Sequence, residues 1–262
     1  MVAGPRAVPG ALLWDVDGTL AETEEQGHRP AFNRAFAEEG LPWRWDLPTY
    51  RRLLAVTGGR ERIAAYLGEV EGQPPDPARV NRLVARKQHH YGEIVGSGSL
   101  PLRPGVARLI GEAAAAGVPQ AIVTTSSTAA VQALAAGALR EWRHAFSFWI
   151  CGEDVTVKKP HPEAYHLALA RLGRDPLNRA PQTVVVLEDS PNGLAAARSA
   201  GLACLVTLSA ASAEEYPAGF TGAGAVLDGL GDGVTPPRLR QGPPCPEGRV
   251  TLSYLACLLD RP

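Results

Sequence analysis

The sequence of 262 residues predicts an α/β fold: a Rossmann-like parallel sheet forms the core, and a helical cap is inserted after the first strand. Two observations predict it. From residue 106 to residue 207, short apolar runs alternate with helical patterns, and strands that are apolar throughout are typical of parallel sheets covered on both faces. Residues 22–96, in contrast, show helical patterns only.

The predicted elements of the core follow from apolar runs and the turn residues beside them. Residues 11–14 form the first apolar run and lead directly into the turn sequence Asp-Val-Asp-Gly-Thr. Further strands are expected at 121–123, 146–151, 183–187 and 202–207, and helices at 106–116, 129–136, 162–172 and 192–200. Residues 1–21 and 97–262 are therefore assigned to one core domain. Residues 229–248 are rich in Gly and Pro and allow no interpretation, but the apolar segment VTLSYLACLL after them predicts a short helix on the core.

Residues 22–96 are expected to form a helical cap domain. Helices are predicted over 22–39, from Asp46, over 60–70 and from Asp76 to about residue 95. Phe32 and Phe36 lie one turn apart on one face of the first helix, which Gly40 ends. Asp76 followed by Pro77 supplies an N-cap and a first-turn proline for the last helix.

The composition limits the possible functions. Lys and Arg together number 26 and Asp and Glu 27, so the basic excess of a general nucleic-acid binder is missing. No apolar run is long enough to predict a membrane-spanning helix, and the N-terminal segment does not resemble a secretion signal. Four cysteines without a CxxC pair predict reduced thiols. We therefore expect a cytoplasmic monomer that has neither nucleic acid nor membrane as a partner.

Polar residues gather where the predicted strands end. Asp15 and Asp17 follow the first strand, Thr124, Thr125 and Ser126 follow the second, Lys159 lies after the third, and Glu188 and Asp189 follow the fourth. Ligand sites of parallel sheets lie at the carboxyl ends of the strands, so these side chains are expected to converge on one site.

Their types favour phosphoryl transfer through a covalent intermediate. The Asp15 carboxylate can attack phosphorus and form an aspartyl-phosphate, which divides hydrolysis into two easier displacements. Asp17 can protonate the leaving oxygen and then deprotonate water. Lys159 and Mg²⁺ would offset the negative charge, and Thr124 and Thr125 offer hydrogen-bond donors to the phosphate oxygens.

The segments that carry these residues resemble those of the haloacid-dehalogenase-like phosphohydrolases. They are WDVDGTLAET (14–23), VTTSS (123–127), KKP (158–160) and VLEDSPNG (186–193), and the resemblance covers roughly residues 11–230. It implies Asp15 as the nucleophile and Asp17 as the acid/base. It also implies Mg²⁺ bound by the Asp15 carboxylate, the Asp17 backbone carbonyl and Asp189, with Glu188 beside these ligands. The insertion resembles the cap of the β-phosphoglucomutase-like branch.

Two cap segments, 21–36 and 53–67, resemble those of the CbbY-type phosphatases of xylulose 1,5-bisphosphate. This resemblance implies a phosphorylated sugar as substrate, with xylulose 5-phosphate and phosphate as products. Two phosphates need two anion sites. The core supplies Thr124, Thr125 and Ser126 for one, and the resemblance implies Gly58, Gly59, Arg60, Arg62 and Lys87 for the other, with Glu24 on the sugar hydroxyls.

Other interpretations remain beside this one. A phosphomutase of the β-phosphoglucomutase kind shares every core motif. A non-catalytic phosphosugar-binding protein is disfavoured because Asp15 and Asp17 are both present. A calcium loop is disfavoured because Gln26 stands where it would need Glu. His28, on the first cap helix, is expected to face solvent or to cap the helix.

Overall fold

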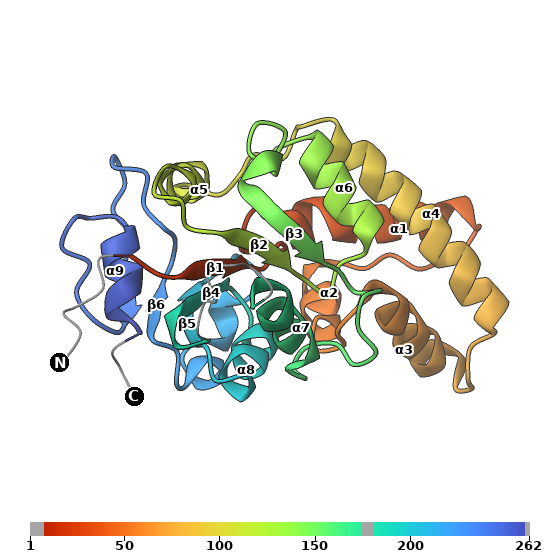
Figure 1. Cartoon of the computed structure of the whole chain (residues 1–262). Helices are drawn as coiled ribbons and strands as arrows, with labels where there is room; N and C mark the ends of the chain where they lie inside the picture. Colours follow the sequence, from red (N-terminus) through yellow and green to blue (C-terminus); the bar gives the residue numbers. More distant parts are fainter. Residues whose placement is uncertain (1–7, 174–180, 260–262) are drawn as a thin grey trace.

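A single sheet lies at the centre of the computed structural model, which describes residues 8–173 and 181–259 (Figure 1). Its seven described strands have the order β3–β2–β1–β4–β5–β6–β7. They are β1 (Ala11–Trp14), β2 (Gln120–Val123), β3 (Phe146–Ile150), β4 (Val184–Glu188), β5 (Ala203–Thr207), β6 (Ala225–Leu227) and β7 (Leu239–Gln241). Neighbouring strands are parallel except β6 and β7. The predicted α/β fold is confirmed.

Helices cover both faces of this sheet. Along β1, Leu12 and Trp14 point to one face and Ala11 and Leu13 to the other, because successive side chains of a strand alternate. The first face packs against α5 (Val106–Ala115), α6 (Thr128–Ala136) and α9 (Leu252–Cys257), and the second against α7 (Glu163–Leu172) and α8 (Pro191–Ser199). β1 lies between β2 and β4, so the residue that follows it emerges at the middle of the sheet edge.

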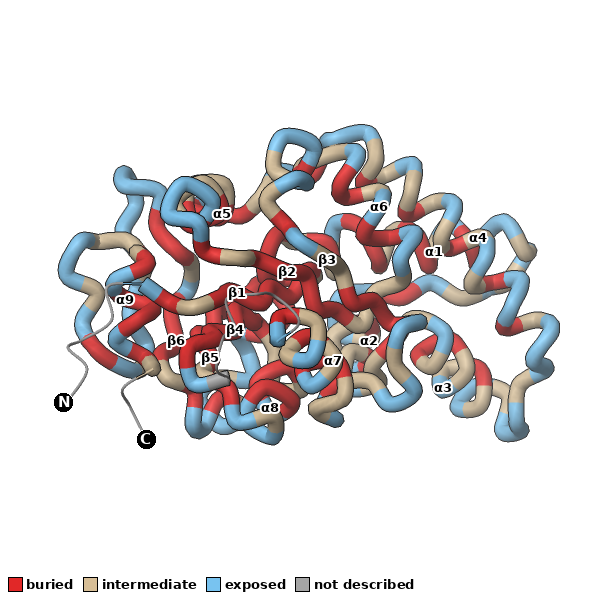
Figure 2. Tube along the Cα trace, viewed as in Figure 1, coloured by how far each residue is buried: buried red, intermediate tan, exposed pale blue. Residues whose placement is uncertain are grey.

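Between β1 and α5, all the regular elements of the described residues are helices. They are a π-helix η1 (Glu24–His28), α1 (Arg29–Glu38), α2 (Leu47–Leu53), α3 (Gly59–Glu71) and α4 (Pro77–Gly96). They enclose their own apolar cluster around Phe32, Phe36 and Trp45, separate from the two clusters of the sheet. Figure 2 shows buried positions along these helices as well as along the strands of the sheet. We call residues 22–96 the cap segment. That it is a domain of its own stays a prediction.

The sequence patterns missed two strands and one helix type. β6 and β7 have three residues each, too few to show a periodic pattern, and β7 lies in the Gly- and Pro-rich tail. The predicted helix over 22–39 begins as the π-helix η1. Short 3₁₀ turns at Arg143–Ala145, Pro181–Thr183, Ala213–Glu215 and Ala218–Phe220 complete the described elements. The helix predicted near the end of the chain is present as α9. No helix of the described residues is long and apolar enough to cross a membrane.

Candidate active site

The ends of β1, β3 and β4 bring a lysine and two carboxylates together. Lys159, in the loop after β3, places its Nζ 2.8 Å from Oδ1 of Asp15 and 2.6 Å from Oε1 of Glu188. It also donates to the carbonyl oxygen of Val123 at 2.7 Å. All three charged side chains are buried. Burial alone would lower the pKa of Lys159, but the charges of Asp15 and Glu188 outweigh it and raise that pKa, so the lysine is a permanent cation.

Glu188 serves mainly to hold this lysine. Its Oε1 also accepts from the Tyr165 hydroxyl at 2.8 Å, and its Oε2 accepts from the backbone N–H of Asp189 and the hydroxyl of Ser190, both at 3.3 Å. The carboxylate can lie here because residue 193 is glycine: a Cβ there would lie 1.9 Å from the Glu188 Cδ. Both oxygens are occupied, which agrees with a place beside the metal ligands.

A divalent cation fits the group of carboxylates formed by Asp15, Asp189 and Glu188. Oxygen atoms of Asp15, Glu188 and Asp189 lie within 4.8 Å of one another. Burial, and the like charges of these neighbours, raise the pKa values of Asp15 and Asp189 well above the usual range. Lys159 compensates only part of this negative charge. Hard oxygen donors in excess over nearby cations are the environment that Mg²⁺ prefers.

The Asp17 carboxylate points away from this cluster toward the cap segment. It accepts hydrogen bonds from Thr23 Oγ1 and Ser126 Oγ, both at 2.5 Å, and lies 2.9 Å from Nε2 of His28. Burial would raise the pKa of Asp17, but His28 and the two hydroxyl donors lower it overall. Its side chain therefore lies apart from the group formed by Asp15, Glu188 and Asp189.

His28 differs from the sequence-based interpretation of a solvated or capping residue. It is buried, stacked on Tyr91 with ring centroids 4.1 Å apart, and its Nδ1 lies 2.7 Å from Nζ of Lys87. That interpretation was wrong because one residue's hydropathy does not show which helix face is buried. A usable signal was the spacing: His28 lies one helical turn after Glu24, a residue already expected in the site.

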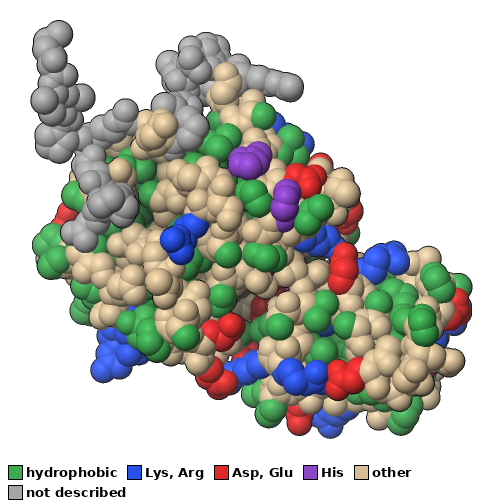
Figure 3. Space-filling view, turned by 90° about the horizontal axis from the view of Figure 1, so that it is seen from below, with side chains coloured by type: hydrophobic (Ala, Val, Ile, Leu, Met, Phe, Trp, Pro, Cys, Tyr) green, Lys and Arg blue, Asp and Glu red, His purple; other side chains and the backbone are tan. Residues whose placement is uncertain are grey.

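Two adjoining cavities extend from the strand ends into the cap segment. The inner cavity, of about 200 Å³, is lined by Asp15, Lys159 and Asp189, among others. The outer cavity, of about 230 Å³, is lined by Gly59, Arg60, Lys87, Ser126 and Lys158, among others. Both are lined by Asp17, Glu24, Gly58, Arg62 and Thr125. In Figure 3 a hollow separates the main body from the smaller lobe formed by the cap segment.

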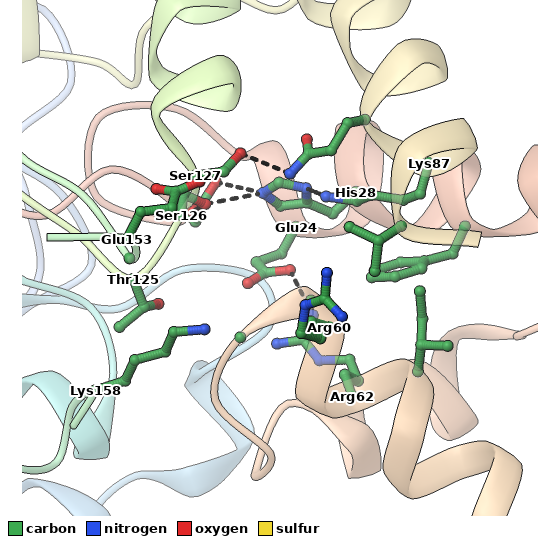
Figure 4. A pocket seen from close by; sticks show the side chains of 18 residues that line it. Glu24, His28, Arg60, Arg62, Lys87, Thr125, Ser126, Ser127, Glu153 and Lys158 are labelled. Atoms are coloured by element: carbon green, nitrogen blue, oxygen red, sulfur yellow. Dashed lines mark hydrogen bonds and ion pairs between the residues drawn. The ribbon is translucent and has the colours of Figure 1, made fainter. Parts of the chain in front are cut away.

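Most of the predicted cap residues therefore line these cavities, but their side chains differ in burial and in hydrogen-bond partners. Arg62 is buried and donates to the hydroxyl of Tyr50 at 3.0 Å. Its side chain also lies beside that of Glu24 (Figure 4), with Nη1 3.6 Å from Oε2. Arg60 is exposed at the rim and donates to the side-chain oxygen of Asn81. Thr124 is the exception among the predicted substrate-binding residues: it lines neither cavity, and its Oγ1 accepts from the backbone N–H of Ser126 at 3.1 Å.

Some residues of the site were not singled out from the sequence. Thr23 binds Asp17, and Tyr165 binds Glu188. Arg103 is buried and donates to the carbonyl oxygens of Gly18 and Leu208, tying the turn after Asp17 to the end of β5. The contacts of Tyr165 and Arg103 join residues more than 20 positions apart, so no local pattern indicates them. Thr23 is a common residue type, and its only signal was its place within the WDVDGTLAET segment.

The fold and the carboxylate–lysine cluster define a class of hydrolase. Residues 9–201 match the family described as haloacid dehalogenase-like hydrolase. This chain belongs to that family, so the predictions of the family and of an enzyme are confirmed.

Within the family, the similarity is to CbbY proteins. The chain is 46% identical over 232 residues to protein CbbY (plasmid) of Cupriavidus necator, which covers 86% of this chain and 87% of that protein. It is 40% identical over 261 residues to a CBBY-like protein of Arabidopsis thaliana, covering 97% of this chain and 76% of that protein. A crystal structure of CbbY from Rhodobacter sphaeroides in complex with xylulose-1,5-bisphosphate matches with a TM-score of 0.75 at 42% identity, covering 84% of this chain and 94% of that chain.

Proposed function

We propose that this hydrolase is a Mg²⁺-dependent phosphatase of small sugar phosphates that acts through an aspartyl-phosphate on Asp15. The observation that carries the proposal is the buried contact of 2.8 Å between Asp15 and Lys159 at the end of β1, an inner strand of the sheet. A carboxylate held there by a permanent cation is oriented toward the inner cavity, where a phosphate would lie.

Asp15 and Asp17 divide the reaction between them. An Asp15 oxygen forms a bond to phosphorus while the ester P–O bond breaks, and the leaving sugar oxygen takes a proton from Asp17. Asp17 then takes a proton from water, whose oxygen attacks phosphorus and breaks the bond to Asp15, so that inorganic phosphate leaves. The low pKa of Asp17 keeps its carboxylate deprotonated in the free protein, which is the form that the second step requires. A phosphate dianion beside Asp17 raises its pKa and so favours the protonated form needed first.

Mg²⁺ would be held by the carboxylates of Asp15 and Asp189 and by the backbone carbonyl of Asp17. When bound, it would neutralise charge on the phosphoryl oxygens that the nucleophile approaches. Lys159 offsets the negative charge of Asp15 itself. Thr125, which lines both cavities, would provide a hydrogen-bond donor to the substrate, and Ser126, which lines the outer cavity, donates its hydroxyl to Asp17.

The substrate we propose is xylulose 1,5-bisphosphate, which would give xylulose 5-phosphate and phosphate. The support is the pair of adjoining cavities, one beside Asp15 and one among the cap residues Arg60, Arg62 and Lys87. The similar CbbY of Rhodobacter sphaeroides has been crystallised with this bisphosphate. We further propose that the cap segment acts as a domain that closes over the substrate, since Asp17, in the core, binds His28, in the cap segment.

Phosphate release with Mg²⁺ from a panel of sugar phosphates tests this proposal. The panel includes xylulose 1,5-bisphosphate, ribulose 1,5-bisphosphate, xylulose 1-phosphate and glucose 1-phosphate, with Asp15→Asn as the control. We expect kcat/KM to be highest for xylulose 1,5-bisphosphate, and no turnover by Asp15→Asn or after chelation of the metal. Retained turnover by Asp15→Asn would refute the assignment of Asp15 as the nucleophile. Formation of an isomeric sugar phosphate in place of free phosphate would show a mutase.

A further inference from the structure

Two adjacent lysines of the chain reach different cavities. Lys159 lies in the inner cavity with Asp15, whereas Lys158 lines only the outer one. The Lys158 side chain leaves the loop after β3, passes Gly152 and extends toward Gly58 at the start of α3: a Cβ on Gly152 would lie 3.5 Å from its Cε, and a Cβ on Gly58 2.7 Å from its Nζ. The lysine thus reaches from the core to the cap segment (Figure 4).

The partner of Lys158 is a carboxylate of the cap segment. Its Nζ lies 2.6 Å from Oε1 of Glu61, and the two side chains are 22% and 43% exposed. The contact uses one oxygen only. The other, Oε2, is buried and has no hydrogen-bond partner among the described residues. A half-exposed ion pair of this kind stabilises a protein little, so a more highly charged anion can replace the carboxylate.

Two other cations of the outer cavity, Arg62 and Lys87, are held more firmly by their partners. Arg62 is buried against Tyr50 and Glu24, and Lys87 is buried against His28. Arg60 donates to the neutral side chain of Asn81 and forms no ion pair with a described residue. Arg60 and Lys158 are therefore the two cationic side chains of this cavity whose present partners an incoming phosphate can most readily replace.

We infer that Lys158 is a specificity-determining residue, whose ammonium leaves Glu61 to bind the far phosphate of a bisphosphorylated substrate. The inference rests on the proposed function, since it places the transferred phosphate beside Asp15. A phosphate dianion attracts an ammonium more strongly than a carboxylate does, because its charge is higher and it offers three acceptor oxygens. Glu61 holds the lysine extended across the cavity until the substrate arrives.

Matched substrates separate this role from that of a simple bridge between core and cap. Xylulose 1,5-bisphosphate and xylulose 1-phosphate share the phosphate to be transferred and differ in the far one. We expect Lys158→Met to lower kcat/KM for the bisphosphate by about tenfold or more, the usual size of a lost hydrogen bond between charged groups, and to change the monophosphate value much less. Glu61→Gln removes the carboxylate that competes with the phosphate for this lysine, so kcat/KM for the bisphosphate should rise relative to kcat/KM for the monophosphate.

Arg52→Met provides the control, because it breaks the ion pair of Arg52 with Glu69, which lies in the cap segment outside both cavities. Arg52→Met should change kcat/KM for neither the bisphosphate nor the monophosphate. A second readout is the Kd of the bisphosphate in the Asp15→Asn background, which Lys158→Met should raise by a similar factor.

Three outcomes would overturn the inference. Equal losses on both substrates for Lys158→Met and Glu61→Gln would show that the pair only bridges core and cap. An unchanged bisphosphate value for Lys158→Met would show that the lysine does not contact the substrate. A wild-type protein that does not prefer the bisphosphate would overturn the proposed substrate as well, and this result is visible before any variant is made.

Discussion

The imidazole of His28 joins the cap segment to the core through Asp17: its Nε2 lies 2.9 Å from Oδ1 of that carboxylate. The opposite nitrogen, Nδ1, lies 2.7 Å from Nζ of Lys87. A protonated lysine can only donate, so Nδ1 accepts and Nε2 carries the hydrogen that Asp17 receives. Lys87 therefore sets the tautomer of His28, and His28 orients Asp17, the group we propose as acid and base.

Replacement of His28 by Phe should lower kcat while changing KM little. Phe can keep the stacking on Tyr91 but cannot bind Asp17 or Lys87. We expect a loss of about 10²-fold, at the lower end of what general acid–base catalysis contributes, because Asp17 itself stays in place. The pH profile of kcat should also shift, since Asp17 loses the partner that lowers its pKa.

His90→Phe is the matched control, because His90 pairs with Glu38 on the cap surface and lines neither cavity. If both variants retained wild-type kcat and pH profile, the positioning role of His28 would be refuted.

Gly18→Ala should weaken metal binding. Gly18 has φ of +83°, a conformation that other residues adopt at a cost, and a Cβ there would lie 2.1 Å from Oδ2 of Asp189. The carboxylate would have to move. We expect the Mg²⁺ concentration for half-maximal activity to rise by roughly 10- to 100-fold, as for other changes that disturb ligand orientation.

Gly40→Ala controls for backbone strain, because Gly40 has φ of +66° and no atom within 4 Å of the added Cβ. The same Mg²⁺ dependence in both alanine variants would contradict the placement of Asp189 as a ligand.

Because Lys87 is buried, the free energy of unfolding should depend on pH in the alkaline range. Burial is the main cause that lowers the pKa of Lys87 to about 8, from a model-compound value of 10.5, although Asp17 and Glu24 oppose it. Between these values the unfolded chain holds a proton that the folded chain has lost, so the free energy of unfolding rises with pH.

This contribution is measured as the difference in free energy of unfolding between the wild type and Lys87→Met. The difference should shift in favour of the wild type from about pH 8 upward, with a slope of at most about 1.4 kcal/mol per pH unit. A difference that stays constant from pH 7 to pH 10 would show that Lys87 keeps its ordinary pKa.

Arg60→Ala should reduce binding of a bisphosphate more than binding of a monophosphate. Arg60 lies exposed at the rim of the outer cavity, so its attraction for a phosphate is screened by salt. We expect kcat/KM for xylulose 1,5-bisphosphate to fall by about tenfold at low salt and by less at high salt, with Arg60→Lys losing less than Arg60→Ala.

Arg34→Ala, at an exposed arginine of α1 that lines neither cavity, should leave both substrates unaffected. Equal losses of the two substrates in Arg60→Ala would argue against a second phosphate site.

Local patterns were sufficient to predict the parallel sheet and the strand-end residues. Short, mostly apolar runs mark β1 to β5, and Asp15, Lys159 and Asp189 come after three of them, so the rule that sites lie at the carboxyl ends of strands brings them together. The helical pattern of residues 22–96 likewise depends on spacing within the segment. These features are readable because each depends on neighbours along the chain.

The tertiary structure decided the contacts between cap segment and core. Whether His28 faced solvent or Asp17, and whether Lys158 met water or Glu61, depends on how two distant segments pack, and no pattern within either segment encodes it. The Thr124 hydroxyl differs, because it accepts from the backbone N–H of Ser126 two positions further along the same turn after β2. The sequence by itself determined which chemical groups lie at the sheet edge; only packing decided which of them face one another, because that depends on distances across the cleft.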